Sequence, residues 1–387
     1  MKNSYTIVIA VLMLCSLNFA QSKGVFDENR KKLTDSTFST LVSRDLVGLA
    51  ACIFKNGEIV WQGNFGWANL EDKVPVDGNT LFKMASVSKT VTGAALMQFF
   101  DKGKFKLDDD INKYIPFSVR NPNYPDIPIT FKMLFSHSSS LSDDLPEIFK
   151  LFGDGDVTEP SLKELVKSFF DKDGKRYSMK NFSNNKPGEK FQYCNLNYVF
   201  IAYLVEVFSG KSFNEYCKEN IFSPLLMNET SYLYKDINLN NHAFNYVTDN
   251  STESKRKRIE HYAWPGYPDG GLHTSMLQYF NFITMLINNG SFNGRQILSV
   301  EAVKSMFTLQ NVDVSNAPKG LVPVSGIGLI WHYLKTGKGN FFYHAGGGTG
   351  ISSLVLIDPA TKSGAFAVGS GTITPAVANV MMLMLMQ

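Results

Sequence analysis

Residues 81–100, LFKMASVSKTVTGAALMQFF, place a serine and a lysine three positions apart at the start of an apolar segment. The pattern predicts a helix from 86 to 101, and because residues at i and i+3 share a helix face, the Ser86 hydroxyl and the Lys89 amine can touch. A serine hydroxyl needs a base, and a lysine can act as one only as a neutral amine, which burial favours. N–H groups at the helix N-terminus would stabilise an oxyanion. The segment therefore predicts a serine nucleophile activated by a buried lysine.

The Ser-x-x-Lys spacing is not specific by itself. It recurs at Ser183 and Lys186 and again at Ser254 and Lys257, both in polar segments. A helix N-cap serine followed by a surface lysine would give the same spacing. The rest of the sequence has to decide between these interpretations.

Composition indicates a globular protein. The 387 residues are 44% hydrophobic and 19% charged, which is enough to bury a large core. The formal net charge of +3 is small for this length and gives no electrostatic reason to expect a nucleic-acid partner. The basic run KRKR at residues 255–258 is flanked by Glu253 and Glu260, and we expect a solvated loop there.

Residues 1–20 have the pattern of a secretory signal peptide. Lys2 is followed by an apolar stretch from Ile7 to Leu17, and the small residue Ala20 precedes the polar residues that follow. This stretch is shorter than the roughly 20 residues that span a bilayer, so a membrane anchor fits the pattern less well. We therefore expect a secreted or periplasmic location, without stable membrane insertion of the mature chain.

The cysteines and histidines do not show the spacing of a metal site. Cys52, Cys194 and Cys217 follow residue 20, an odd number, so their pairing is open. No Cys-x-x-Cys occurs, and the histidines are never spaced as His-x-x-x-His. We therefore expect no metal and no other cofactor.

Strand patterns lie near both ends of the chain. Residues 47–67 contain two β-rich runs around Asn56 and Gly57, which predicts a hairpin. Residues 328–370 contain three strand-like runs separated by turns, and the apolar residues 375–386 after them predict a closing helix.

The middle of the chain has helix patterns, for example at 161–170 and 198–210. Together these patterns predict an α+β (α/β) fold, in which an antiparallel sheet is flanked by helices and completed by both chain ends. We expect a sheet domain of residues 21–115 and 266–387, a mostly helical insertion of residues 116–265, and the active site between them.

Five blocks of sequence occur in the order of a known family. They are FKMASVSKTVTGAAL at 82–96, ITFKMLFSHSSSL at 129–141, PGEKFQYCNLNYVFIAYLVE at 187–206, GYPDGGLHTS at 266–275 and HAGGGTGISSLVLIDP at 344–359. The set resembles the serine β-lactamase and penicillin-binding protein superfamily, in particular the branch of class C β-lactamases, DD-peptidases and related esterases. The resemblance covers nearly the whole chain after residue 20 and implies a β-lactamase/transpeptidase-like fold.

The resemblance also implies roles for individual residues. Ser86 would be acylated, Lys89 would accept its proton, and Tyr193 would act as a second base and as proton donor to the leaving group. Asn195 would orient Lys89 and the substrate, and the N–H groups of Ser86 and Gly347 would form the oxyanion hole. Without the resemblance, Tyr193 and Asn195 would be interpreted as a core aromatic residue and a helix N-cap.

The sequence departs from the family at the triplet that normally binds a substrate carboxylate. Residues 335–337 spell the usual Lys-Thr-Gly, but they lie in YLKTGKGNFFY, where we expect a turn between strands. The expected strand pattern follows His344, Ala345 and Gly346 instead, so these three residues are the predicted substrate-binding triplet. A neutral histidine and an alanine without a hydroxyl would each remove about 1–3 kcal/mol of carboxylate binding. The alternative for His344 is an edge histidine satisfied by its neighbours.

These features predict an exported serine hydrolase that cleaves ester, amide or peptide bonds of small molecules through an acyl-enzyme. The alternatives are a true β-lactamase or DD-carboxypeptidase and, in another class, a non-catalytic binding or scaffold protein. A Ser-His-Asp hydrolase with a Gly-x-Ser-x-Gly elbow is excluded, because that motif does not occur. We expect aromatic residues such as Phe135, Tyr262 and Trp264 to line a specificity pocket. Glycosylation and oligomeric state are open.

Overall fold

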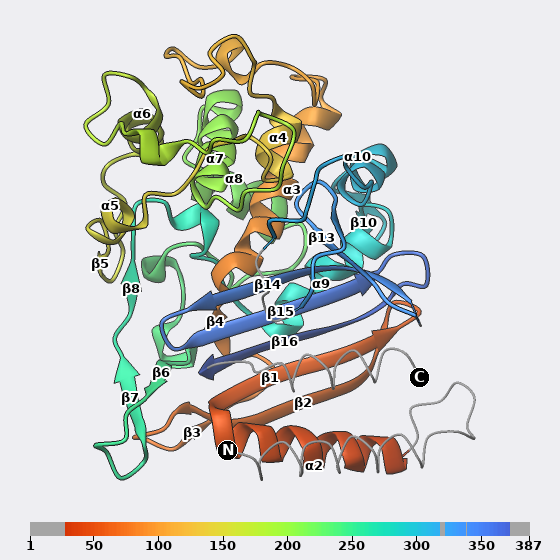
Figure 1. Cartoon of the computed structure of the whole chain (residues 1–387). Coiled ribbons are helices and arrows are strands. Elements are labelled where there is room, and N and C mark those ends of the chain that lie inside the picture. Colours follow the sequence, from red (N-terminus) through yellow and green to blue (C-terminus); the bar gives the residue numbers. More distant parts are fainter. Residues whose placement is uncertain (1–27, 318–321, 338, 372–387) are drawn as a thin grey trace.

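The computed structural model describes residues 28–317, 322–337 and 339–371. It contains a large antiparallel sheet with helices on both faces, which confirms the predicted fold class (Figure 1). The signal peptide predicted at 1–20 and the helix predicted at 375–386 lie outside the described residues. Within the described ranges, no helix combines the length and the apolar character needed to cross a membrane.

Strands from the two ends of the chain complete the main sheet, as predicted. Its spatial order is β12-β13-β14-β15-β16-β1-β2-β3, and all neighbouring strands are antiparallel. The predicted hairpin joins β1 and β2 at Asn56 and Gly57, whose φ angles of 53° and 83° suit a tight turn. The strands are β1 (Leu46–Lys55), β2 (Glu58–Asn69), β3 (Val74–Pro75), β12 (Gly326–Ile327), β13 (His332–Lys335), β14 (Asn340–Gly348), β15 (Ile351–Asp358) and β16 (Ser363–Gly371).

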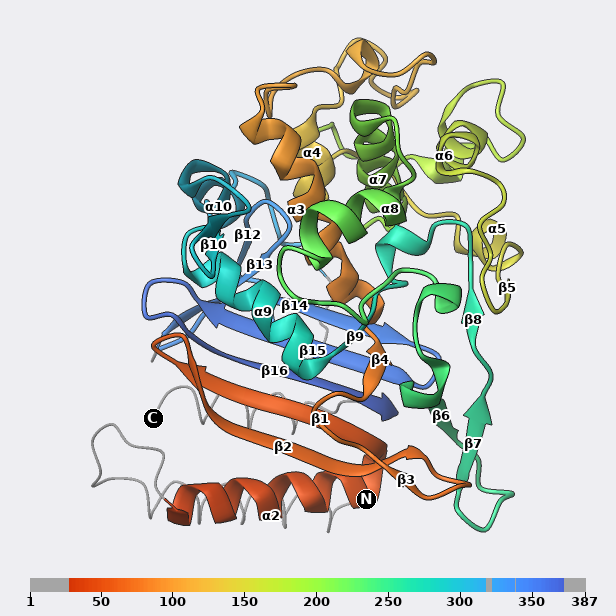
Figure 2. The same ribbon diagram turned by 180° about the vertical axis from the view of Figure 1, so that it is seen from behind.

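Most helices gather above one face of the sheet, where α3 packs against α7 (Figures 1 and 2). The helix expected at 198–210 begins two residues earlier, and it ends where Gly210 adopts the left-handed conformation with φ 70°. The helices are α2 (Glu28–Asp45), α3 (Ser88–Asp101), α4 (Phe131–Phe135), α5 (Leu145–Phe149), α6 (Leu162–Phe170), α7 (Leu196–Ser209), α8 (Phe213–Cys217), α9 (Met276–Ile287) and α10 (Val300–Met306).

Each face of the sheet has its own hydrophobic core, because side chains alternate between the two faces along a strand. On β1, Leu49 and Ile53 face one core together with Phe38 of α2. Ala50 and Phe54 face the other core, which continues into the helical layer. Helix α2 therefore covers one face of the sheet, and α9 packs on β1 and β16 from the other (Figure 2).

The middle of the chain also contains short strand pairs. The basic run at 255–258 falls mainly in β7, which pairs with β6, so the expectation of a loop there is wrong. The strand could not be recognised from the sequence, because its charged side chains show no strand pattern. The pairing itself is made by backbone hydrogen bonds. The short pairs are β4 (Leu81–Lys83) with β9 (His273–Ser275), β5 (Gly153–Asp154) with β8 (Tyr262–Ala263), β6 (Asn245–Thr248) with β7 (Arg256–Ile259), and β10 (Ser291–Phe292) with β11 (Arg295–Gln296).

Candidate active site

Ser86 lies in a short 3-10 turn, η1 (Ala85–Val87), immediately before α3. The regular helix therefore begins at Ser88, two residues later than predicted. Ala85 has a φ of 45°, a strained value for a residue with a side chain. The Ser88 hydroxyl holds this turn, because it donates to the backbone oxygen of Ala85 (2.6 Å) and accepts from the N–H of Leu272 (3.0 Å). The Ser86 side chain is left free to reach the cavity described below.

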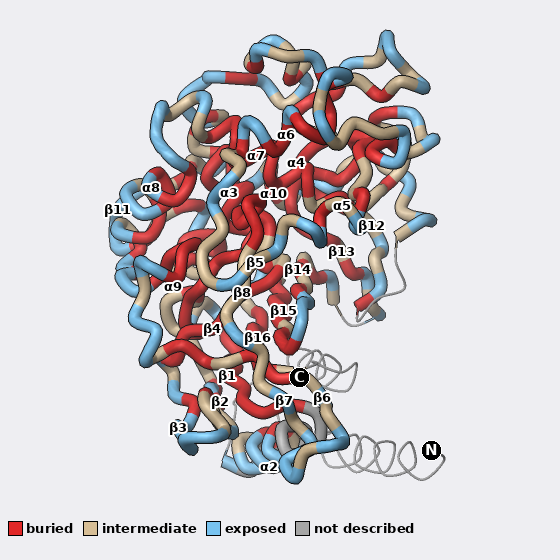
Figure 3. The backbone as a smooth tube through the Cα atoms, turned by 90° about the vertical axis from the view of Figure 1, so that its left-hand side faces the viewer, coloured by how far each residue is buried: buried red, intermediate tan, exposed pale blue. Residues whose placement is uncertain are grey.

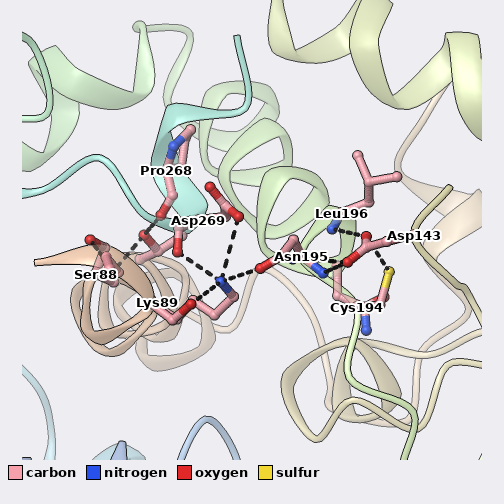
Figure 4. Close-up of polar contacts among 12 residues, drawn as sticks. Ser88, Lys89, Asp143, Cys194, Asn195, Leu196, Pro268 and Asp269 are labelled. Carbon is pink, nitrogen blue, oxygen red and sulfur yellow. Dashed lines mark hydrogen bonds and ion pairs between the residues drawn. The ribbon is translucent and has the colours of Figure 1, made fainter. Parts of the chain in front are cut away.

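Lys89 is fully buried in α3, and its ammonium nitrogen contacts three segments of the chain (Figure 4). Nζ donates to Ser86 Oγ (3.3 Å), to Asn195 Oδ1 (2.8 Å) and to the backbone oxygen of Asp269 (2.8 Å). The structure therefore brings Ser86, Lys89 and Asn195 together.

Asp143 fixes the orientation of Asn195 at the start of α7 (Figure 4). Its Oδ2 accepts from the backbone N–H (2.8 Å) and from Nδ2 (2.9 Å) of Asn195, and its Oδ1 accepts from the N–H of Leu196 (3.1 Å). Because the amide nitrogen is committed to Asp143, the amide oxygen points to Lys89. Sequence analysis missed Asp143, because two adjacent aspartates in a polar segment between two motifs have no specific pattern.

Tyr193 reaches the same group of side chains from the segment before α7. Its ring centre lies 5.3 Å from Lys89 Nζ, and its ring stacks on His137 at 4.4 Å with an angle of 26° between the planes. His137 is held in turn by Cys194, whose N–H donates to His137 Nδ1 (3.2 Å). The stack therefore holds a phenol ring near Lys89, and Tyr193 lines the same cavity as Ser86.

The Lys89 amine was expected to be neutral, and this expectation is wrong. Burial acts to lower the pKa of Lys89, but Tyr193, Asp269 and Asp143 together act more strongly in the opposite direction and raise the pKa above its usual value. Asp269 Oδ2 lies 3.6 Å from Nζ, with the Lys89 side chain 0% and the Asp269 side chain 10% exposed. These neighbouring charges favour the ammonium form of Lys89, and in that form Lys89 cannot take the Ser86 proton.

Asp269 is a second residue that sequence analysis missed. It ends the short turn η7 (Tyr267–Asp269), and its Oδ1 accepts from the indole N–H of Trp264 (3.0 Å). Burial raises the pKa of Asp269, and the neighbouring Lys89 acts to lower it. The available signal was an acidic residue directly before the Gly-Gly turn of GYPDGGLHTS.

Strand β14 runs close to the nucleophile turn. The Ser353 hydroxyl donates to the backbone oxygen of Met84 (2.6 Å), which ties the sheet to this turn. A Cβ atom on Gly346 would lie 2.7 Å from Met84 O and 3.0 Å from Ser86 N, so this approach requires glycine. The next residue, Gly347, lines the cavity with Ser86, where two N–H groups are expected to bind an oxyanion.

None of the three residues of the predicted triplet, His344, Ala345 and Gly346, is among the residues that line the cavity. His344 is fully buried, its ring stacks on His332 at 5.2 Å, and its Nδ1 lies 3.1 Å from its neighbour's backbone oxygen, Ala345 O. Burial, followed by His332 and Lys89, holds the pKa of His344 well below its usual value, so the ring is neutral. The structure thus corrects the expectation that the His344 side chain meets the substrate. It does not match the alternative of an edge histidine satisfied by its neighbours either, because β14 lies inside the sheet and, among the described residues, His344 Nε2 is buried without a hydrogen-bond partner.

The Lys-Thr-Gly sequence at 335–337 lies at a turn, as expected. Strand β13 ends at Lys335, and the N–H of Thr336 donates to the backbone oxygen of Gly339 (3.0 Å) before β14 begins. These three residues therefore match the family motif in sequence but do not lie where the motif strand would be.

Ser86 opens into a cavity of about 960 Å³. Tyr262 and Trp264 line it, as predicted, whereas Phe135 is fully buried in the core and does not, so that expectation is wrong. Lys83 also lines the cavity, donates to the backbone oxygen of Tyr262 (2.6 Å) and has a pKa lowered by burial to about 8. The cavity therefore offers both cationic and aromatic groups to a bound molecule.

The three cysteines Cys52, Cys194 and Cys217 are free and buried. Burial and the neighbouring Asp143 raise the pKa of the Cys194 thiol well above its usual value, so Cys194 is not a thiolate nucleophile. Among the residues described, no group of three or more His, Cys, Asp or Glu side chains is arranged to hold a metal ion.

Comparison with known proteins gives matches over most of the chain. Residues 30–381 match the family described as Beta-lactamase. The chain is 25% identical over 236 residues to Penicillin-binding protein 4* of Bacillus subtilis (strain 168), covering 59% of this chain and 48% of that protein. It is 26% identical over 218 residues to Protein flp of Staphylococcus aureus (strain MRSA252), covering 55% of this chain and 41% of that protein. These matches span less than half the length of either relative.

Solved structures share the fold at lower identity. The octameric penicillin-binding protein homologue from Pyrococcus abyssi gives a TM-score of 0.69 at 22% identity, covering 91% of this chain and 76% of that one. The D-amino acid amidase from Ochrobactrum anthropi SV3, complexed with D-phenylalanine, gives 0.71 at 18% identity, covering 91% of this chain and 97% of that one. With the sequence match over residues 30–381, the chain belongs to the beta-lactamase family.

The close approach of β14 to the Ser86 turn generates a first prediction. A methyl group in the Gly346→Ala variant would overlap Met84 O and Ser353 Oγ, so we expect a loss of about 1–3 kcal/mol in the free energy of unfolding and slower labelling of Ser86 by a fluorophosphonate. Urea denaturation and labelling kinetics measure the two effects. The matched variant Gly337→Ala has nothing within 4 Å of the new methyl group and should behave as wild type. Equal behaviour of the two variants would contradict the assigned position of β14.

Proposed function

We propose that this protein is a serine hydrolase that cleaves ester or amide bonds through an acyl-enzyme on Ser86. The observation that carries the proposal is the contact between Ser86 Oγ and the buried Lys89 ammonium (3.3 Å) at the wall of a 960 Å³ cavity. Burying an ammonium costs free energy unless polar partners compensate it. A binding or scaffold protein has no need to place such a group against a partly exposed hydroxyl, which argues against that alternative.

The charge on Lys89 gives the role of base to Tyr193. In the proposed reaction Tyr193 is the base, and the adjacent ammonium would stabilise negative charge on its oxygen. Tyr193 takes the Ser86 proton as Oγ attacks the substrate carbonyl carbon, and then gives this proton to the leaving alcohol or amine. The N–H groups of Ser86 and Gly347 bind the oxyanion. Water next attacks the acyl-enzyme as Tyr193 accepts its proton, and Tyr193 then gives this proton to Ser86 Oγ as the acid is released, which restores both residues.

The preferred substrates in this proposal are esters or amides without a terminal carboxylate. His344 is buried and neutral, and Ala345 has no hydroxyl, so the predicted triplet has no side chain that would bind a carboxylate strongly. The second candidate is a β-lactamase or DD-carboxypeptidase. A fold neighbour from Yersinia pestis is described as a beta-lactamase/D-alanine carboxypeptidase, with a TM-score of 0.68 at 19% identity.

We also propose that the protein is exported to a secreted or periplasmic location. The support is the sequence of residues 1–20, in which a positive residue precedes a short apolar stretch and a small residue.

The second prediction concerns the nucleophile. Purified protein should hydrolyse p-nitrophenyl acetate and be labelled by a fluorophosphonate, whereas Ser86→Ala should lose both activities because the proposed acyl-enzyme forms on the Ser86 hydroxyl. Absorbance of p-nitrophenol and in-gel fluorescence measure them. Ser254→Ala removes a serine with the same spacing to a lysine, and this variant should keep both. Full hydrolysis by Ser86→Ala would eliminate the proposal.

The third prediction concerns β-lactams. Loss of about 1–3 kcal/mol of carboxylate binding at each of two positions should lower kcat/KM for nitrocefin by roughly 30-fold or more relative to an enzyme with a Lys-Thr-Gly strand. Nitrocefin absorbance measures this, with p-nitrophenyl acetate as the check that the preparation is active. Rapid nitrocefin turnover would favour the second candidate function.

The fourth prediction concerns pH. The Asp269 carboxylate raises the pKa of Lys89, so Asp269→Asn should lower that pKa, and the loss of activity at alkaline pH should begin at a lower pH. The profile of kcat/KM against pH for p-nitrophenyl acetate measures the shift. Trp264→Phe removes a hydrogen bond to Asp269 but keeps its charge, so the alkaline limb should stay near that of wild type. An unchanged limb in Asp269→Asn would show that Asp269 does not set the charge on Lys89.

A further inference from the structure

One wall of the active-site cavity is apolar although much of it is exposed to water. We define the apolar wall as Leu145, Phe149, Phe152, Tyr262 and Trp264, all of which line the cavity that contains Ser86. Phe149 is 63%, Leu145 45% and Phe152 38% exposed. Exposed apolar side chains that gather at one place commonly mark a binding site.

The side chains of the apolar wall are held in place by a strand pair and by ring stacking. Strand β5 pairs with β8, with Gly153 opposite Ala263, and the two strands run together on one side of the molecule (Figure 3). Phe152 stacks on Trp264 with ring centres 5.8 Å apart and planes 7° apart, and Phe149 lies 6.0 Å from Phe152. These contacts hold several rings at fixed positions facing the same cavity.

The apolar wall is also continuous with the nucleophile site. The Trp264 indole N–H donates to Asp269 (3.0 Å), and the same aspartate pairs with Lys89, which contacts Ser86 Oγ. A substrate that presents its carbonyl group to Ser86 therefore has this wall within the same cavity. This continuity indicates that the apolar wall binds a part of the substrate itself.

We propose that the active site prefers esters or amides that carry an aromatic or medium-length alkyl group, which packs on the apolar wall. This rests on the proposed hydrolase function and names its substrate class. Binding such a group covers exposed rings, and each fully buried methylene would raise kcat/KM by up to roughly fourfold. Ethyl acetate carries neither kind of group and gains nothing from this contact, and within each ester series chain length separates binding at the wall from the chemistry at Ser86.

The test compares two ester series. One series lengthens the acyl group and consists of p-nitrophenyl acetate, butyrate and octanoate. The other lengthens the alcohol and consists of ethyl and octyl acetate, whose hydrolysis is measured with a pH-stat. We expect kcat/KM to rise at least tenfold with length in one of the two series. In Phe149→Ser this ratio of long to short substrate should fall severalfold. Val300→Ser, which alters a 60% exposed apolar residue on α10 outside the cavity, should keep the wild-type ratio.

The outcomes separate this inference from the proposed function. Hydrolysis of acetates with no dependence on length in either series would overturn the inference and leave the hydrolase proposal standing. Failure to hydrolyse any ester, together with failure of fluorophosphonate labelling, would overturn the hydrolase proposal. A third outcome is that kcat/KM does not depend on chain length, that the wild-type protein elutes as a dimer, and that Phe149→Ser elutes as a monomer. This outcome would overturn the inference and show that the apolar wall is a contact between two copies of the chain.

Discussion

The rest of the structure depends on how one buried ammonium group is compensated. Lys89 Nζ is withdrawn from water, and it contacts a hydroxyl, an amide oxygen and a backbone oxygen, with the Asp269 carboxylate at 3.6 Å. A buried cation without these partners would be strongly destabilising. The partners come from η1, from the start of α7 and from η7, so the charge is accommodated only when these three segments are assembled. The same assembly places positive charge beside Ser86, where the proposed acyl transfer would use it.

Two anchors hold this arrangement from opposite sides. On the helical side, Asp143 orients Asn195 and accepts from the first N–H group of α7. On the sheet side, Ser353 binds the backbone of Met84, and Gly346 allows β14 to approach the nucleophile turn. Because the two anchors lie in different layers, the site depends on the packing of helices against the sheet. The conformation of any single loop would not suffice to form it.

Sequence patterns predicted the features that depend on short segments. The hairpin at Asn56 and Gly57 and the apolar helix that starts close to Ser86 follow from local backbone and periodicity rules. Asp143 and Asp269 could not be found in this way, because their importance arises from contacts with residues distant in the sequence. The charge on Lys89 was mispredicted for the same reason: burial alone lowers a lysine pKa, and the neighbouring groups that raise it are visible only in three dimensions.

The central claim is that Lys89 is charged in the folded protein, and its titration tests that claim most directly. Lysine labelled with ¹³C at Cε gives an NMR signal for each side chain, and a Lys89→Arg variant assigns the signal of Lys89. Our account predicts that this signal keeps the ammonium chemical shift through neutral pH and titrates above the usual lysine range. A signal that titrates near neutral pH would show a neutral amine at Lys89 and would contradict the assignment of the base to Tyr193.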